Sequence, residues 1–489
     1  MVAKTRFHVQ KRAYRIVFYA LACILLVLGI FQSFQDHAAN VEIVYDQNLI
    51  SLSPFEYTDF NNSRLNYIYE ALVTYSEDLK IVPKLAVAFG EITPTQYLFK
   101  IKDNIYLHNQ KHVDSDFIIQ YFKDIQQVEA LASLTQNIDN LQRLDDYSFY
   151  INLKQADALF LAKLANLAIA DSSQISDLKN NPVGTGPFIL KGQTANQIYL
   201  EPFQSYHGNA SKFEQLLLTS IPNQTQRLDY ALTNPSVLAI FGMSPVFKER
   251  LTSNRFSLQN YIEGSTNFFL YNYNRPMAKT ANFRTQLQMA LSLDMDFESF
   301  TQGMGKDSSQ FLASGVFGYN PAIKDSTDLQ AIEYQNYQPQ ILLPKNFEKI
   351  AESLTIALEK HSIYPQFSFE NLYELEPKQV SRNYDLIFFG FKSDFFDGQS
   401  LFESFQPDSK FNYGNYNSQE FNQLVEQLTE TTKIKPRQKL LQDLSQKILD
   451  PQKPLGVPLF ENQVYYALSK NYQLNPRLDG YLDLSLISY

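Results

Sequence analysis

Hydrophobic and polar positions along the chain follow two alternating patterns, which predict a mixed α/β fold. Short apolar runs are typical of buried strands, and apolar residues at three- and four-residue spacing are typical of helices that present one face to a core. The expected strands cover residues 41–45, 97–101, 149–153, 188–190, 197–202, 268–273 and 386–389. The expected helices cover residues 63–72, 115–126, 284–293, 346–361, 418–428 and 436–449.

The N-terminus carries a basic segment followed by an uncharged apolar run. Five basic residues, from Lys4 to Arg15, precede the run 16–31, and the first acid is Asp36. Extended to residue 34, the run spans about 28 Å as a helix, close to a hydrocarbon core of about 30 Å. By the positive-inside rule, we expect residues 1–15 to be a cytoplasmic tail, residues 16–34 a transmembrane helix, and everything after about residue 36 to lie outside.

Cleavage of this segment is not favoured. Ala38 and Ala39 are the only small-residue pair nearby, and His37 occupies a position where a signal peptidase site needs a small residue. Cys23 lies in a loose lipoprotein-like box, but the apolar run continues beyond it to Ile30. We therefore expect residues 16–34 to be a transmembrane anchor or uncleaved signal, with Cys23 as one of its apolar residues.

Composition indicates a large, well-cored exported part. The chain has 489 residues, 44% of them hydrophobic and 19% charged, and a net charge of −9, which makes nucleic acid an unfavourable partner. Because Cys23 is the only cysteine, the exported part can form no disulfide. Roughly 450 exported residues exceed what one hydrophobic core usually supports, so two or three lobes are expected.

A loop with two glycines between two prolines is the most distinctive local motif. It runs through Pro182, Gly184, Thr185, Gly186 and Pro187. Proline fixes φ and glycine opens left-handed conformations, so the segment predicts a rigid turn that enters the strand 188–190. A phosphate-binding loop would place Lys-Ser or Lys-Thr at a helix start, and here a strand-like run follows instead, so we exclude a nucleotide site.

This loop resembles the signature loop of bacterial extracellular solute-binding proteins of family 5, the dipeptide, oligopeptide and nickel binders of ABC transporters. Other segments resemble that family's blocks in the same order, across roughly residues 41–468. They are 65–73 (LNYIYEALV), 81–88 (IVPKLAVA), 97–102 with 114–119, 272–276 with 282–294, 384–397 (YDLIFFGFKSDFFD), 413–425, 437–449 and 454–460.

The resemblance implies an α/β, bilobed, periplasmic-binding-protein-like fold of class II with an extra inserted small lobe. Lobe I would combine residues 41–60, 183–265 and 462–489. The small lobe would be 61–182, and lobe II would be 266–461. The hinge would lie where two strands cross between the lobes, at Gly264, Ser265, Thr266, Glu461 and Asn462.

The resemblance also implies a ligand site after the strand 386–389, in the segment Gly390, Phe391, Lys392, Ser393, Asp394 and Asp397. In peptide-binding relatives the first acid of this block holds the α-ammonium group of the ligand, and Asp394 matches it. A carboxylate partly shielded by aromatic rings suits that role through a charge-assisted hydrogen bond. The alternative is that Asp394 or Asp397 only caps the helix that follows.

Three departures from the family pattern leave the ligand class open. Leu52-Ser53-Pro54 replaces the usual Leu-Asp-Pro, and Asn109-Gln110 replaces an Asp-Gly turn. Phe391 stands where the family has tryptophan, and the chain has no tryptophan, against 38 Phe and 31 Tyr. The last change alters the wall of the pocket itself.

The residues give catalysis little support. His108 and His112 have the spacing of two ligands on one helix face, but the glutamate of a zinc protease is missing between them. No serine lies in a nucleophile elbow, and no spacing suggests a catalytic triad. We expect no enzyme activity, no metal site and no cofactor.

The function implied by the resemblance is capture of a dipeptide or oligopeptide between two lobes, followed by docking of the closed protein on ABC transporter permease subunits. The protein would act as a monomer, tethered to the bacterial membrane through its N-terminal helix. Two alternatives remain: the same fold could bind another solute, such as a nickel chelate, haem or a glycan, or the protein could be a surface sensor or chaperone without a transport role.

Overall fold

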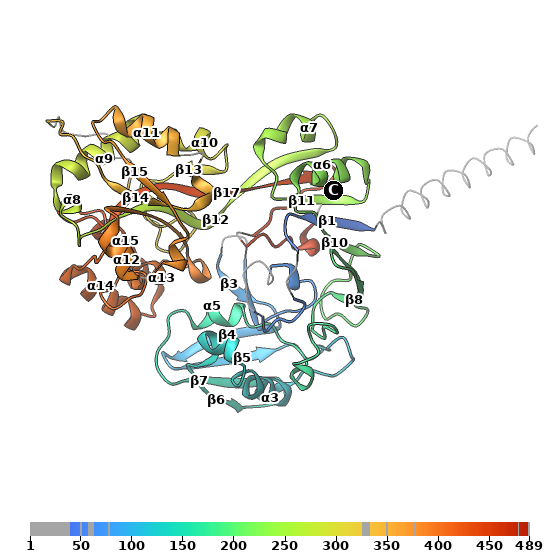
Figure 1. The fold of residues 1–489 in the computed structure, drawn as a ribbon. Helices are drawn as coiled ribbons and strands as arrows, with labels where there is room; N and C mark the ends of the chain where they lie inside the picture. Colours follow the sequence, from blue (N-terminus) through green and yellow to red (C-terminus); the bar gives the residue numbers. More distant parts are fainter. Residues whose placement is uncertain are drawn as a thin grey trace, which may run out of the picture.

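Two strands join the two largest bodies of the molecule. The computed structural model describes residues 40–48, 51–56, 63–76, 79–324, 333–348, 351–375, 377–477 and 479–487. Figure 1 shows lobe II on the left, lobe I at the upper right and the small lobe below, with β12 (Phe256–Tyr271) and β17 (Gly456–Ser469) running between the two upper bodies. We keep these three names for the expected segments, whose boundaries stay a prediction.

The expected cytoplasmic tail 1–15 and membrane segment 16–34 lie outside the described residues. Within the described ranges, no helix is both long and apolar enough to span a bilayer.

Lobe I is built on one half of an eleven-stranded sheet. From the crossing strands outward, the order is β17, β11, β1, β10, β9 and β8, with β1 parallel to both β10 and β11. β1 is buried at every position and apolar at all but Glu42, as expected for a strand covered on both faces. The other elements are β8 (Phe188–Gln193), β9 (Gln197–Pro202), β10 (Leu216–Ser220), α6 (Gln224–Thr233), β11 (Val237–Phe241), η3 (Pro245–Phe247), α7 (Lys248–Thr252) and η7 (Leu484–Leu486), after β1 (Val41–Tyr45).

The small lobe is a four-stranded antiparallel sheet with helices and a separate hairpin. The strand order is β4, β5, β7, β6, and β2 pairs with β3. Helix α3 begins where the Asp114 carboxylate accepts a hydrogen bond from the Phe117 amide at 2.8 Å. The elements are β2 (Val73–Tyr75), β3 (Ile81–Pro83), β4 (Ala86–Thr93), β5 (Gln96–Ile101), α3 (Ser115–Ile125), η1 (Glu129–Leu131), α4 (Ala132–Thr135), β6 (Ile138–Arg143), β7 (Ser148–Leu153), α5 (Phe160–Ala165) and η2 (Ser172–Gln174).

Lobe II uses the other half of the large sheet. From the crossing strands outward, the order is β12, β16, β14 and β15, and β13 pairs with β17 on the opposite edge. The elements are α8 (Pro276–Lys279), α9 (Ala281–Asp294), α10 (Phe297–Phe300), β13 (Gly305–Asp307), β14 (Gln340–Leu343), η4 (Lys345–Phe347), α11 (Ala351–Glu359), β15 (Gln366–Phe369), η5 (Leu372–Glu374), α12 (Pro377–Asn383), β16 (Leu386–Lys392), η6 (Asp394–Phe396), α13 (Gln399–Glu403), α14 (Gln419–Glu430) and α15 (Ile434–Lys447).

The hydrophobic cores show which lobes form one packed unit. One core joins side chains of the small lobe, such as Phe99 and Phe149, to side chains of lobe I, such as Ile43 and Leu216. Lobe II has a core of its own, drawn from residues 268–460. A shared core resists relative motion, so lobe I and the small lobe behave as one body and lobe II as another.

A buried ion cluster further fastens the small lobe to lobe I. The Glu70 carboxylate lies 3.2 Å from Lys84 Nζ and 2.6 Å from His207 Nε2, and it accepts a hydrogen bond from the Tyr206 hydroxyl at 2.6 Å. Burial opposes ionisation of Glu70, but Lys84, His207 and Tyr206 outweigh it and lower its pKa to about 2. Glu70 is therefore ionised at neutral pH.

Most expected elements are confirmed, but the helix expected over 63–72 is wrong. Only residues 63–65 are helical, and Glu70 pairs with Ile169 in an antiparallel bridge. The carbonyls of Tyr67 and Ile68 accept hydrogen bonds from Phe188 and Gly186 instead of from their own helix. The strand expected over 268–273 is longer than the pattern suggested, because β12 begins at Phe256 in lobe I.

Candidate functional site

The strand pair that joins the lobes is interrupted at one place. β12 and β17 pair from Phe256 with Ser469 to Ile262 with Gln463, and pairing resumes only at Thr266 with Glu461. Gly264, inside this break, has φ +78°, a backbone conformation that residues other than glycine rarely adopt. The expected hinge residues therefore surround the wider of two irregular points in a long ladder, the other being a register shift between Asn267 and Phe268, and their role as a hinge stays a prediction.

Polar side chains hold the strands together at this break. The Asn462 amide donates to Ser265 Oγ at 2.8 Å, and Asn267 donates to the Asn462 side-chain oxygen at 2.7 Å. The buried Glu461 carboxylate accepts from the backbone and the hydroxyl of Ser314 at 2.6 and 2.9 Å. Hydrogen bonds to side chains thus replace the missing ladder bonds.

The expected ligand loop starts directly beside the hinge. β16 pairs with β12 so that Lys392 lies opposite Ser265 and Gly390 opposite Asn267. The Ser393 amide donates to the Gly264 carbonyl at 3.1 Å. The expected hinge residues and the expected ligand residues are therefore neighbours. A change of angle at the expected hinge would move the ligand loop.

The loop itself is held in a strained backbone conformation. Phe395 and Phe396 have φ of 56° and 54°, which costs a non-glycine residue on the order of 1–3 kcal/mol. Phe317 secures the loop: its amide donates to the Phe396 carbonyl at 2.8 Å, and its carbonyl accepts from Gly398 at 3.0 Å. Such strain persists only where surrounding contacts fix it, and it is common at binding sites.

The loop touches the small lobe across the cleft. The Tyr75 hydroxyl donates to the Phe395 carbonyl at 3.2 Å, and the rings of Tyr75 and Phe396 meet edge to face at 5.5 Å. Phe395 also packs against the core shared by lobe I and the small lobe. The sequence pattern did not mark Tyr75 as a contact between lobes, because it lies in a short strand whose residues alternate between buried and half-buried.

The expected ligand residues differ in their exposure. Asp394 is exposed, and its amide donates to Ser400 Oγ at 3.2 Å. Phe391 and Lys392 are half-buried, and Ser393 is buried. Asp394 is thus the more accessible of the two carboxylates in the loop.

Asp397 occupies a different environment from Asp394. It is buried, forms an ion pair with Arg437 at 2.7 Å, and accepts a hydrogen bond from the Gln399 amide at 2.9 Å, at the start of α13. Burial raises the pKa of Asp397, and Arg437 opposes that shift. These contacts match the local structural role that was the alternative to ligand binding.

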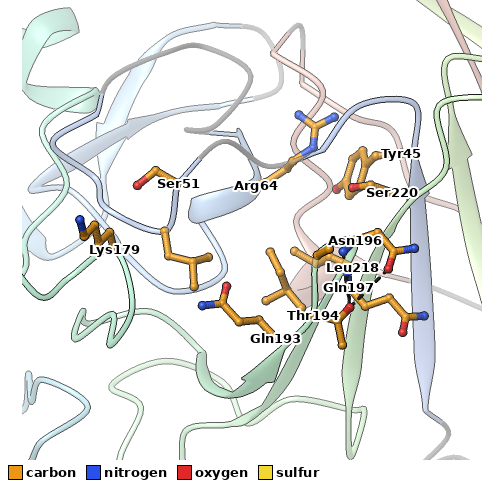
Figure 2. Close-up of a pocket in the computed structure, with 13 residues that line it drawn as sticks. Tyr45, Ser51, Arg64, Lys179, Gln193, Thr194, Asn196, Gln197, Leu218 and Ser220 are labelled. Carbon is orange, nitrogen blue, oxygen red and sulfur yellow. Dashed lines mark hydrogen bonds between the residues drawn. The ribbon is translucent and has the colours of Figure 1, made fainter.

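Lobe I presents the carboxyl ends of its parallel strands. Tyr45, Ser220 and Phe241 are the last residues of β1, β10 and β11, and ligands of open α/β sheets bind at such edges. Figure 2 shows a cavity of about 100 Å³ at this edge, with Tyr45 and Ser220 on one side and Lys179 on the other. Arg64 stacks on the Tyr45 ring at 3.9 Å.

Arg64 brings a buried positive charge to this wall. Burial lowers its pKa to about 10, while Tyr45 and Asp46 favour the charged form. Arg64 therefore remains a cation at neutral pH. A positive charge on Arg64, a residue of the small-lobe segment, thus lies at the edge of lobe I, and a negative charge on Asp394 lies in the loop of lobe II.

The double-glycine loop does enter β8 at Phe188, as expected, but the reason for its glycines differs. Neither Gly184 nor Gly186 has a positive φ. A Cβ at either position would lie within 2.6 Å of the Ile68 carbonyl oxygen. The glycines are needed for close approach to the segment 67–69 rather than for left-handed backbone, and the loop contributes support rather than a binding group.

His108 bridges this loop from the small lobe. Its Nε2 lies 3.1 Å from the Gly186 carbonyl oxygen, and the Gly184 amide donates to its Nδ1 at 3.4 Å. Burial lowers the pKa of His108 to about 4, so the ring is neutral at pH 7. Within the ranges that the structure describes, no three or more His, Cys, Asp or Glu side chains gather in a way that could hold a metal ion.

These features define a class of protein: two packed α/β bodies are joined by a pair of crossing strands, as in hinged solute-binding proteins. The chain belongs to the bacterial extracellular solute-binding proteins of family 5. The family model, described as "Bacterial extracellular solute-binding proteins, family 5 Middle", matches residues 80–413, which confirms the resemblance seen in the sequence. The family is one of solute-binding proteins rather than enzymes.

Relatives with different ligands resemble this chain. The "Nickel-binding periplasmic protein" of Escherichia coli (strain K12) is 26% identical over 44% of this chain and 42% of its own length. The "Nickel-binding protein NikA" of Staphylococcus aureus is 22% identical over 83% of this chain and 86% of its own. The alignment thus spans less than half of the first relative and most of the second.

A solved structure shows the same mixed α/β fold. It is the "ABC transporter-associated periplasmic binding protein DppA from Helicobacter pylori in complex with peptide STSA", with a TM-score of 0.67 and 18% identity. The match covers 90% of this chain and 96% of that one. The periplasmic-binding-protein-like fold therefore extends over nearly the whole chain.

Proposed function

We propose that the protein captures short peptides between lobe I and lobe II and delivers them to the permease subunits of an ABC transporter. The observation that carries this proposal is Asp394, an exposed carboxylate in a strained aromatic loop beside the hinge. A free α-ammonium group suits this carboxylate, because a charge-assisted hydrogen bond gains strength when aromatic rings keep water away. The peptide in the DppA structure supports this ligand class.

Ligand capture follows from the packing of the lobes. Lobe I and the small lobe share one core, so they form one wall of the cleft as a unit. A peptide that touches Asp394 on lobe II and Arg64 of the small-lobe segment, at the edge of lobe I, is attracted at both of its charged ends. Such a ligand stabilises the closed arrangement because it makes its full set of contacts only there.

Placement at the membrane completes the proposal. Residues 16–34 would keep the protein at the outer surface of the bacterial membrane as a single-pass anchor, with residues 1–15 in the cytoplasm. Tethering raises the effective concentration of the closed protein at the permease without any new contact. One copy has both walls of the cleft, so a monomer is sufficient.

A non-peptide solute is the second candidate, because two relatives are named for nickel binding. Native mass spectrometry of the full chain, purified without refolding, distinguishes the two. A distribution of short peptide masses supports the proposal, and a single non-peptide mass supports the second candidate. An empty protein whose melting temperature no peptide mixture raises would contradict both and favour a sensor or chaperone role.

A further inference from the structure

A second cavity adjoins Tyr75. We call it the tail cavity: its volume is about 550 Å³, and its lining includes Tyr75, residues 82–84, Ala165, Asn475, Arg477, Tyr481, Asp483 and Leu486. Its described lining includes nothing from lobe II. Tyr75 lines the cavity and also donates to Phe395, so the cavity adjoins the expected ligand loop at this residue.

Most charges in the wall of the tail cavity are already balanced. Lys84 lies 3.2 Å from the Glu70 carboxylate. Arg477 is paired with Asp479, with its Nε 3.2 Å from Oδ1, and its Nη1 donates to the Thr74 hydroxyl at 2.9 Å. Each cation therefore has its own carboxylate at hydrogen-bond distance.

Asp483 carries a further negative charge, which neither of these ion pairs neutralises. Its Oδ1 accepts hydrogen bonds from the amide of Ser485 at 3.0 Å and from its hydroxyl at 2.6 Å, both neutral donors. Asp483 lines the cavity. Burial lowers the pKa of Lys84 and of Arg477, but Glu70 and Asp479 respectively raise it, and Asp483 adds a smaller contribution of the same sign to each, so that both pKa values are raised overall. With Asp479, which does not itself line the cavity, the two ion pairs and Asp483 together carry one net negative charge.

The rest of the wall suits a ligand that is partly apolar. Val82, Pro83 and Ala165 supply apolar surface, and the Tyr75 and Tyr481 side chains add aromatic surface. The Tyr481 ring already takes the Arg477 guanidinium over its face at 4.8 Å, so the Asp483 carboxylate is the group that attracts a further organic cation. An aliphatic stem would lie along the apolar part while its charged end reaches Asp483.

We propose that the tail cavity receives an organic cation, an alkylammonium or guanidinium group, with Asp483 as its anionic partner. The cation is the side chain of a basic residue in a peptide held at Asp394, and this part rests on the proposed function. A free amine would supply the same chemistry. The tail cavity makes the protein selective for peptides with a basic side chain.

Calorimetry on the full chain tests this with three tripeptides and one amine: Ala-Lys-Ala, Ala-norleucine-Ala, Ala-Ala-Ala and 1,5-diaminopentane. Norleucine keeps the stem of lysine without its charge. We expect Ala-Lys-Ala to bind about tenfold more tightly than Ala-norleucine-Ala, as for one charge-assisted contact. Asp483→Asn should abolish this preference and leave Ala-Ala-Ala binding unchanged.

The variants are matched for structure. Asparagine also accepts the hydrogen bonds from Ser485, so Asp483→Asn keeps the turn. Asp116→Asn removes an equal charge from the exposed outer face of the small lobe, where its partner is Arg143 at 3.4 Å, and should change nothing. A preference that is absent in the wild type, or that survives Asp483→Asn, overturns the proposal.

The same experiment separates this proposal from the peptide-binding function. Binding of Ala-Ala-Ala without any preference for lysine refutes the tail cavity and leaves peptide capture standing. Binding of 1,5-diaminopentane that depends on Asp483, with no tripeptide binding, refutes peptide capture and supports the cavity as a site for free amines. Failure of all four probes to bind refutes both.

Discussion

The hydroxyl of Tyr75 donates a hydrogen bond to the main-chain oxygen of Phe395 at 3.2 Å, and this contact joins the small lobe to lobe II. The two residues lie on different packed bodies, since Phe395 follows β16 and Tyr75 ends β2. The bond therefore exists only while the lobes are close together.

Removing that hydroxyl should speed ligand release. Tyr75→Phe keeps the ring against Phe396 and loses one hydrogen bond, which weakens affinity for a captured ligand about two- to tenfold. Most of the change should be in the dissociation rate, as measured by surface plasmon resonance. Tyr150→Phe, on the small-lobe sheet, is the control, and equal rates for the two variants would show that the contact plays no part in closure.

Asp394 should discriminate between free and blocked peptide amines. Asp394→Asn keeps the shape of the loop and removes the charge, so affinity for a peptide with a free amino terminus should fall about ten- to a hundredfold. An acetylated peptide should bind both proteins equally. Glu426→Gln, on the exposed face of α14, removes the same charge elsewhere on lobe II. Equal loss in both variants in calorimetry would contradict a role as ammonium partner.

Affinity should also respond to a second contact between lobe II and lobe I. Gly303 precedes β13, and Pro245 follows the carboxyl end of β11, so their contact joins the two lobes on the edge of β17 away from β12. A Cβ at Gly303 would come within 2.7 Å of the Pro245 ring. Bulk there holds the two lobes apart at this contact.

Gly303→Ala should therefore bind ligand more weakly, and it should also lower the melting temperature because φ at this position is +81°. Pro245→Ala leaves more room at the contact and should not weaken binding. The two affinities are measured by calorimetry against the wild type. Weaker binding in Pro245→Ala, or unchanged binding in Gly303→Ala, would contradict this role of the contact.

Stability should fall in mild acid because of His108. Its folded pKa of about 4 lies below the usual value of about 6.5, so the unfolded chain binds the proton more readily between these values. Stability from this group is complete above pH 6.5 and is lost as the pH falls toward 4. Urea unfolding of wild type and His108→Gln at pH 7.5 and 5 measures this. If acidification lowers the free energy of unfolding equally in the wild type and in the variant, groups other than His108 cause the loss.

Sequence patterns were sufficient for elements whose character is local. β16 begins with a run of four buried apolar residues, and α14 and α15 place apolar residues at helical spacing, so each was visible without knowing its neighbours. The segment 63–72 was misread because its backbone bonds to residues 186 and 188, far along the chain. No local periodicity can report such a contact.

The candidate site was predictable only in part, for a similar reason. The segment 390–397 stood out through its acids among aromatic residues, and it does lie beside the hinge. Its two acids look alike in sequence, yet only the fold separates the exposed Asp394 from Asp397, whose partner Arg437 comes from α15. Tyr75 and Pro245 matter through contacts between lobes, and those depend on tertiary geometry alone.

The position of β17 in the large sheet has a consequence for synthesis. β17 lies between β12 and β11, although only 20 residues follow it in the chain of 489. While the chain emerges, β11 and β12 each expose an unpaired edge, which invites association with other chains until the last strand inserts. A stop codon before residue 456 would therefore yield two separate half-sheets with open edges instead of a shortened receptor.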